Sequence, residues 1–189
     1  MFKTFFESGF EHILDINAYD HVIFIISICL LANFKSWRKL LILITAFTIG
    51  HSLTLALSAL DILKIPSIII ESVIPITIIF SALDNIYQSG KEELFSPKYL
   101  LVLVFGFIHG MGFSNYFKAL LGKEENITGP LFAFNVGVEV AQLCIVALTL
   151  IVLFILNRLG VKQKYPTIIG SSIIIIISVY LLIKVLAKG

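Results

Sequence analysis

The sequence predicts an all-α fold, namely a polytopic transmembrane helix bundle of about six helices joined by short loops. The 189 residues are 58% hydrophobic and only 14% charged, and their mean hydropathy is +1.01. A soluble domain of this length could not bury so much apolar surface, whereas lipid can solvate it. Six stretches are also long enough to cross a bilayer core of ~30 Å, which requires ~20 apolar residues per helix. We therefore expect a single transmembrane domain over residues 1–189.

The expected helices follow one another closely along the chain. They cover residues 20–34, 37–60, 66–87, 98–121, 130–157 and 166–186. The first is short, and the polar residues of segment 1–19 before it predict an entrance at the membrane boundary. Four prolines stand at or near helix starts, where a missing N–H costs no hydrogen bond: Pro66, Pro97, Pro130 and Pro166. Pro75 lies inside a helix and predicts a kink, because it removes one backbone hydrogen bond.

Two further patterns bear on the helices. The isoleucine run 173–177 is typical of a strand in a soluble protein. In lipid only helices and closed barrels satisfy the backbone, so we expect a helix there. Gly106, Gly110 and Gly112 fit close packing between helices, which would let other groups approach His109.

Basic residues predict the orientation in the membrane. One side of the bundle receives Lys35, Arg38, Lys39, Lys91, Lys98, Arg158, Lys162 and Lys164. The other side receives Lys3, Lys64, Lys118, Lys123, Lys184 and Lys188. The first set is larger and denser in its loops, so the positive-inside rule places the first, third and fifth loops in the cytoplasm and both termini outside. Basic residues scattered in this way do not indicate a nucleic-acid partner.

The ionisable residues inside the apolar stretches are the candidates for function, because such side chains usually face a bundle interior or a watery cavity. All four histidines lie in or beside expected helices, and carboxylates join them at similar depth in the outer half. Imidazole with carboxylate suits a divalent transition metal such as nickel or zinc. The expected metal ligands are His12, Asp20, His21, His51, His109 and Glu139, with Glu71, Asn135 and Gln142 beside them.

Each of these residues also has a structural interpretation. A single histidine within a membrane often forms hydrogen bonds between helices and binds nothing. Asp84 and Asn85 lie near the predicted cytoplasmic boundary, where capping or contact with the membrane surface is the favoured interpretation. Thr45, Thr48, Ser52 and Thr54 are able to bond to carbonyl groups of their own helix.

Five ordered blocks of the sequence resemble the HupE/UreJ family of bacterial membrane proteins. The blocks are Gly9-Phe10-Glu11-His12-Ile13-Leu14 with Asp20-His21; residues 45–55 (TAFTIGHSLTL); Glu71 with 82–85 (ALDN); residues 105–113 (FGFIHGMGF); and residues 134–142 (FNVGVEVAQ). The resemblance implies a multi-pass protein of the bacterial inner membrane. It also implies a site for a divalent metal, using His12, Asp20, His21, His109 and Glu139, as in nickel permeases of hydrogenase and urease systems.

The sequence departs from the nickel permeases of that family at two places. Seven residues separate His12 from Asp20, where the permeases resemble His-x5-Asp-His. Their later His-Gly-x-Glu element reads His109-Gly110-Met111-Gly112 here, so its glutamate is missing. The chain therefore looks closer to the less characterised second branch of the family. The departures bear on the identity of the metal, nickel, more than on the expectation that a metal is bound.

Three functions remain open at the level of sequence. A permease for a divalent transition metal is favoured by the resemblance. The alternative is an intramembrane zinc-dependent hydrolase acting on a lipid or lipid-like substrate, with Asp20, Glu139 and Ser52 as candidate catalytic residues. A metal-sensing or assembly protein without turnover would carry the same residues. The expected partners are membrane lipid and a metal ion, and the sequence leaves open whether the chain is a monomer or a homo-oligomer.

Overall fold

The computed structural model describes residues 1–15, 19–32, 36–89, 97–122 and 126–187. Within these ranges the protein consists of eight α-helices and contains no strand, so the all-α prediction is confirmed. The helices are α1 (Phe2–Leu14), α2 (Asp20–Cys29), α3 (Trp37–Ala59), α4 (Ser67–Gln88), α5 (Pro97–Gly112), α6 (Ser114–Leu121), α7 (Thr128–Arg158) and α8 (Lys164–Leu186).

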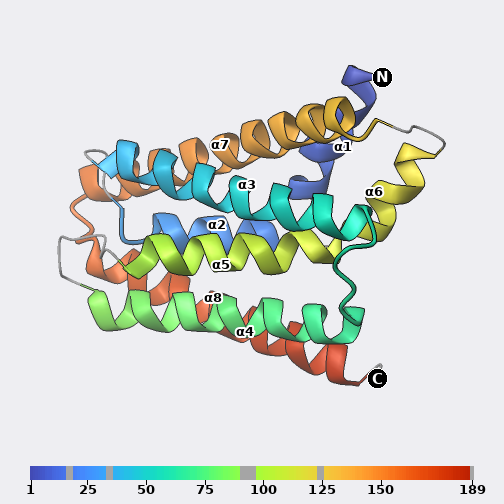
Figure 1. The fold of residues 1–189 in the computed structure, drawn as a ribbon. Coiled ribbons are helices and arrows are strands. Elements are labelled where there is room, and N and C mark those ends of the chain that lie inside the picture. The colour runs from blue at the N-terminus through green and yellow to red at the C-terminus, as the bar shows by residue number, and fades with distance from the viewer. Residues whose placement is uncertain (16–18, 33–35, 90–96, 123–125, 188–189) are drawn as a thin grey trace.

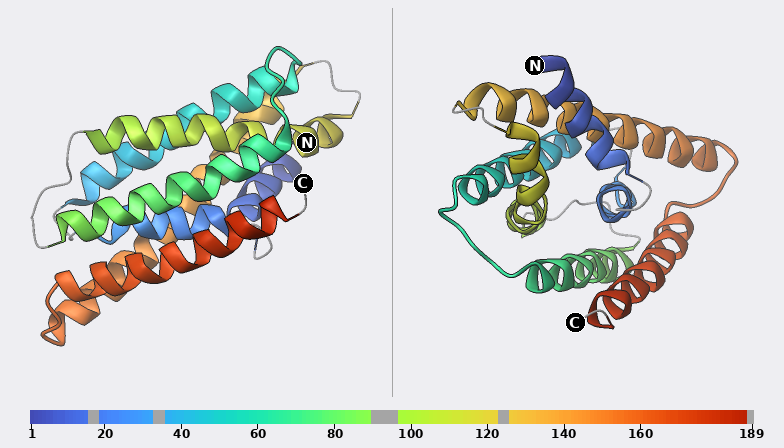
Figure 2. Two further views of the ribbon diagram at one scale, coloured as in Figure 1. Left: turned by 90° about the horizontal axis from the view of Figure 1, so that it is seen from below. Right: turned by 90° about the vertical axis from the view of Figure 1, so that its right-hand side faces the viewer.

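The longer helices lie side by side and run roughly parallel or antiparallel to one another (Figure 1). Helix α3 packs against α5, α1 against α7, and α4 against α8, while the short helix α2 contacts α4, α7 and α8 between them. The start of α1 and the end of α8 lie at the same end of the bundle as α6, as Figures 1 and 2 show. Which membrane side this end faces stays a prediction from the basic residues.

The predicted count of six transmembrane helices is not confirmed. Four helices of the described chain are long and apolar enough to cross a membrane by themselves, namely α3, α4, α7 and α8. Helices α5 and α6 would add a fifth as a broken span, because the predicted helix 98–121 ends at Gly112 and resumes at Ser114 after a bend of 52°. Helix α2 has only ten residues, fewer than the predicted 20–34. Residues 2–14 of the predicted entrance segment form helix α1.

Two prolines and the isoleucine run lie where the sequence predicts, while the kink expected at Pro75 stays a prediction. Helix α4 begins directly after Pro66, and Pro97 is the first residue of α5. Pro75 lies within α4, which runs without a break from Ser67 to Gln88. The isoleucine run 173–177 is part of α8, so the prediction of helix over strand is confirmed.

Glycines allow two helix pairs to touch at their backbones. In the α3–α5 pair, a Cβ atom on Gly106 would clash with the carbonyl oxygen of Phe47, and one on Gly110 would clash with that of His51. In the α1–α7 pair, Gly9 meets the carbonyl oxygen of Phe134 in the same way. Gly112 has only side-chain neighbours at ordinary distance, so the predicted role in close packing holds for two of the three α5 glycines.

The C-terminal end of α2 is held by side chains from other helices. Thr167 Oγ1 and Gln163 Nε2 donate to the carbonyl oxygen of Leu30, over 2.7 Å and 2.8 Å. Asn85 Nδ2 donates to the carbonyl oxygen of Ser27 over 2.7 Å. Helix ends leave carbonyl groups without partners, so these contacts replace the hydrogen bonds that a longer helix would make. They fix α2 in the middle of the bundle, and with it Asp20 and His21 at its start.

Candidate metal centre

All four histidines of the chain converge on one place. His12 lies near the end of α1, His21 is the second residue of α2, His51 is on α3, and His109 is in the last turn of α5. The ring of His21 lies 4.6 Å from that of His12 and 4.6 Å from that of His109, measured between centroids. The rings of His12 and His51 are 5.8 Å apart. Four different helices, α1, α2, α3 and α5, therefore contribute imidazoles to a single cluster.

The potential ligand atoms form two overlapping groups. In the first group, one nitrogen each from His12, His21 and His51 lie within 4.8 Å of one another. In the second, a carboxylate oxygen of Asp20 joins nitrogens of His21 and His109 within the same limit. Around a tetrahedral ion with bonds of ~2.1 Å, ligand atoms are ~3.4 Å apart, so small side-chain rotations would suffice to close either group.

The imidazoles of the cluster are unusual in lacking hydrogen-bond partners. Six buried ring nitrogens have none in the described part of the chain: His12 Nε2, both nitrogens of His21, both of His51, and His109 Nε2. Buried polar atoms without partners are rare in folded proteins, and each carries a desolvation cost. A concentration of them in one place fits a site for a metal ion, to which neutral imidazole offers a lone pair.

His109 shows which nitrogen would face a metal. Its Nδ1 atom lies 3.1 Å from the carbonyl oxygen of Phe105. A carbonyl oxygen can only accept, so Nδ1 carries the proton and the lone pair is on Nε2. That Nε2 atom lies 3.8 Å from Oδ2 of Asp20, whose Oδ1 is in turn 3.2 Å from His21 Nδ1. A backbone contact behind the ring thus orients a ligand nitrogen toward the carboxylate.

A layer of aromatic rings closes the cluster on one side. Phe24, Phe47 and Phe105 each lie one helical turn from a histidine on the same helix, in the direction of the opposite end of the bundle. The rings of Phe24 and Phe105 stack at 3.6 Å, and Phe47 lies 5.7 Å from Phe24. All three side chains are at most 1% exposed. The three buried rings therefore form a packed layer between the histidines and the other end of the bundle.

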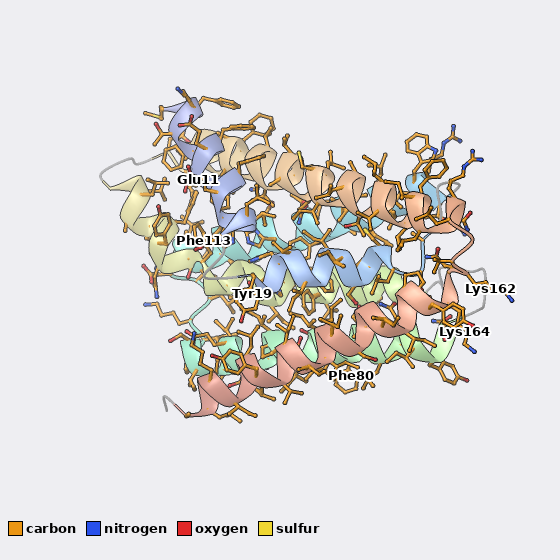
Figure 3. All side chains as sticks on the ribbon, turned by 180° about the vertical axis from the view of Figure 1, so that it is seen from behind. Glu11, Tyr19, Phe80, Phe113, Lys162 and Lys164 are labelled. Atoms are coloured by element: carbon orange, nitrogen blue, oxygen red, sulfur yellow. The ribbon has the colours of Figure 1, made fainter. Side chains whose placement is uncertain are left out.

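On its other side, the cluster borders a cavity. A cavity of about 490 Å³ is lined by residues of α1 and of the α5–α6 bend, including Glu11, His12, Asp15, Phe113 and Tyr116. The ring of His12 lies 3.8 Å from that of Phe113. Figure 3 shows Glu11, Tyr19 and Phe113 at one end of the bundle and Lys162 and Lys164 at the other. The cavity therefore opens at the end away from these lysines, and His12 is the histidine that lines it.

Glu139, a predicted ligand, belongs to neither group of ligand atoms. Its Oε1 atom accepts a hydrogen bond of 2.8 Å from Thr45 Oγ1. It lines a separate groove of about 430 Å³ between α3 and α7, together with Thr48 and Ser52. Ser52, a predicted catalytic residue, donates to the carbonyl oxygen of Thr48 over 2.6 Å, as expected for a hydroxyl that bonds to its own helix.

The residues expected beside the ligands are dispersed. Gln142 is buried and accepts a hydrogen bond of 2.9 Å from Thr48. Asn135 donates to the carbonyl oxygen of Leu131, within its own helix. Glu71 lies exposed on α4. Of the nine residues expected in or beside the site, the structure brings together His12, Asp20, His21, His51 and His109.

Two acidic residues outside the cluster have structural roles. Asp84 accepts a hydrogen bond from the side chain of Gln88, one helical turn away. Its neighbour Asn85 donates to the Ser27 carbonyl oxygen of α2, as described above. Asp61, between α3 and α4, accepts a hydrogen bond of 2.7 Å from Lys118 on α6. This bond, together with the charges of Lys118 and Lys64, lowers the pKa of Asp61 below its usual value.

Sequence reasoning missed the aromatic layer and the bend at Phe113. The layer had a signal in the sequence, since Phe24 follows His21 by three residues, and Phe47 and Phe105 precede His51 and His109 by four. These are the spacings at which side chains share one helix face. The bend follows Gly110 and Gly112, two residues that weaken a helix.

Comparison with known proteins gives one family match, which covers nearly the whole chain. A protein-family model described as "HupE / UreJ protein" matches residues 1–185. No match was found among curated proteins, and none was found among solved structures. The family match includes every residue of the histidine cluster.

Proposed function

The chain belongs to the HupE/UreJ family, whose members are associated with nickel and cobalt transport, and we propose that it is a permease that carries a divalent transition-metal ion through a bacterial inner membrane. The observation that carries this proposal is the cluster of buried imidazole nitrogens without hydrogen-bond partners, next to a cavity at one end of the bundle. The proposed ligands are His12, His21, His51, Asp20 and His109.

The residues suggest how an ion would be captured. The cavity carries the exposed carboxylates Glu11 and Asp15 at its rim, which attract a hydrated cation. His12 faces both the cavity and the cluster, so it would be the first ligand to replace a water molecule of the ion. Neutral imidazole together with one carboxylate is a donor set that suits nickel, cobalt or zinc and disfavours calcium or magnesium.

The aromatic layer implies that the ion would be released by a change of conformation. Phe24, Phe47 and Phe105 separate the cluster from the basic end of the bundle. Under this proposal, release at that end requires these rings to move, and the described conformation would be that of a carrier open toward the cavity. The broken helix pair α5–α6 carries both His109 and Phe113, so its movement would change the cluster and the cavity together.

Transport can be tested in vesicles that contain only the purified protein. The experiment measures uptake of nickel and of cobalt into proteoliposomes, for the wild type and for His51→Ala. A matched control is Glu71→Gln, since Glu71 is exposed and lies outside the cluster. We expect uptake by the wild type and by Glu71→Gln, and none above empty vesicles for His51→Ala. Equal uptake by His51→Ala would contradict the proposed site, and no uptake by the wild type would contradict transport.

One observation favours the second candidate, an intramembrane zinc hydrolase. A cluster closed by an aromatic layer on one side resembles a blind active-site pocket more than a pathway. Bound zinc would supply a Lewis acid for the activation of water. In that case Asp20, the carboxylate beside His21 and His109, is the residue placed to accept a proton. Absence of uptake by a chain that holds stoichiometric zinc would favour this candidate.

A further inference from the structure

His21 occupies a position that no other residue of the cluster shares. It is the single member common to the group of His12 and His51 and to the group of Asp20 and His109. Its ring meets those of His12 and His109 edge-on, at interplanar angles of 68° and 66°. Both of its nitrogens are buried and without hydrogen bonds in the described chain. His21 therefore lies between the two groups and is able to serve either, with its Nδ1 atom 3.2 Å from Asp20 Oδ1 of the second group and its ring 4.6 Å from that of His12 in the first.

The two groups differ in chemistry. His12, His21 and His51 offer three neutral nitrogens, whereas Asp20, His21 and His109 offer two nitrogens and a negative oxygen. Two divalent ions placed in both groups at once would lie only a few ångströms apart and would repel each other strongly at low dielectric. They would also compete for His21. One ion at a time is the arrangement that these distances favour.

The two groups also differ in access. His12 lines the cavity, so the first group is in contact with it. In the second group the Asp20 side chain is 19% exposed, but the His109 side chain is 1% exposed and its ring lies 4.3 Å from Phe105 of the aromatic layer. In the first group the His51 ring lies 5.9 Å from Phe47 of the same layer. The second group is thus the one closer to the barrier that an ion would have to pass.

We propose that the chain has two alternative metal positions that share His21, and that an ion passes from the first position to the second while His21 stays bound. In this transfer His12 and His51 leave the ion as Asp20 and His109 bind it, so the ion gains a carboxylate ligand next to the aromatic layer. The inference rests on the proposed function, because it assigns an order to the same ligands.

Cobalt binding to the purified full-length protein tests this directly, since Co²⁺ reports its ligands in absorption spectra. The experiment measures the number of cobalt ions per chain by equilibrium dialysis, together with the visible spectrum. The variants are His12→Ala, His109→Ala, His21→Ala and His21→Gln, with Glu71→Gln as control. Circular dichroism verifies that each variant is folded.

We expect one cobalt per wild-type chain, and also one at saturation in His12→Ala and in His109→Ala. The spectra of these two variants should differ, because one retains the carboxylate group of ligands and the other the three-histidine group. Both His21 variants should bind at least tenfold more weakly than either of them. Two ions per wild-type chain would overturn the proposal, and so would identical spectra or His21 variants that bind as well as His12→Ala.

The outcome is separable from that of the vesicle experiment. If the binding pattern fails while uptake persists, the shared-ligand proposal is wrong and the permease stands. If the binding pattern holds while the wild type takes up no metal, the two positions stand and transport is wrong.

Discussion

Gly110 of α5 packs directly against the backbone carbonyl oxygen of His51 on α3. The residue before this glycine is His109, so this contact, together with that of Gly106 with Phe47, sets the distance between the two helices that carry half of the histidine cluster. Thr54 Oγ1 lies in the same contact, close to where a Cβ atom of residue 110 would be. The positions of His51 and His109 thus depend on the absence of a side chain at residue 110.

The first prediction concerns this contact. Gly110→Ala would place a methyl group against the main chain of α3, so the helices must separate or strain. Overpacking of this kind costs about 1–3 kcal/mol. We expect a lower melting temperature in detergent and weaker metal binding. The control is Gly112→Ala, whose added Cβ meets only side chains at ordinary contact distance, Ile70 at 3.5 Å and Ile74 at 3.9 Å. An unchanged melting temperature for Gly110→Ala, equal to that of the control, would contradict the packing described.

The second prediction concerns the anchoring of α2. Asn85→Leu removes the donor to the Ser27 carbonyl oxygen and leaves a buried acceptor without this partner, at a cost of about 1–3 kcal/mol. Because α2 carries Asp20 and His21, we expect both the melting temperature and metal affinity to fall. Thr149→Val is the control, since Thr149 bonds only within its own helix in the described contacts. Loss of stability without any loss of affinity would argue against the link between α2 and the site.

The third prediction separates two carboxylates. Asp20→Asn removes the charged member of the cluster and should weaken metal binding by about tenfold or more, roughly 1.4 kcal/mol. Glu139→Gln should leave binding unchanged, because Glu139 bonds to Thr45 and lines a different groove. Isothermal titration with nickel compares the two variants. If both substitutions weakened metal binding equally, Glu139 would be a ligand and the prediction would be wrong.

The fourth prediction concerns pH and the contact between Asp61 and Lys118. The pKa of Asp61 is lower in the folded chain than in the unfolded one, where it is about 3.9. The contact therefore stabilises the fold above that value, and its contribution is lost as the pH falls through the lower, folded pKa. Asp61 has a positive φ of 60°, a conformation that asparagine tolerates, so Asp61→Asn changes mainly the charge.

We accordingly expect Asp61→Asn to melt below the wild type at pH 7, and this difference to shrink as the pH falls below about 3.9 toward the lower, folded pKa of Asp61. Thermal unfolding measured across this range is the test, and the same difference at every pH would show that the contact is not electrostatic. Glu71→Gln, an exposed charge without a described ion pair, serves as the control.

The sequence was sufficient for the fold class and for most of the cluster. Composition and the lengths of the apolar stretches predicted helices, and the cost of burying imidazole in lipid identified all four histidines. The convergence of the four histidines could not be derived, because it depends on contacts between helices, such as those of Gly9 with Phe134 and of Gly110 with His51. Depth along a helix, the quantity used for Glu139, does not tell which face of α7 a residue occupies.

The length of α2 and the bend between α5 and α6 also could not be predicted from the sequence. Helix α2 has ten residues because its C-terminal carbonyl groups find partners on α4 and α8, among them Asn85 and Thr167. Such partners lie more than 50 residues away along the chain, and hydropathy cannot detect them. The bend between α5 and α6 likewise follows from weak local helix preference, which apolar composition conceals.

X-ray absorption at the nickel edge of the purified, nickel-loaded chain tests the central claim, which is that the histidine cluster holds a metal ion. The account predicts one nickel per chain, bound by nitrogen and oxygen ligands with the scattering signature of at least two imidazoles. It also predicts that this signal is absent from a variant that lacks His12, His21, His51 and His109 but retains its helix content. A wild-type chain that retains no nickel after dialysis, or a four-histidine variant with the same spectrum, would contradict it.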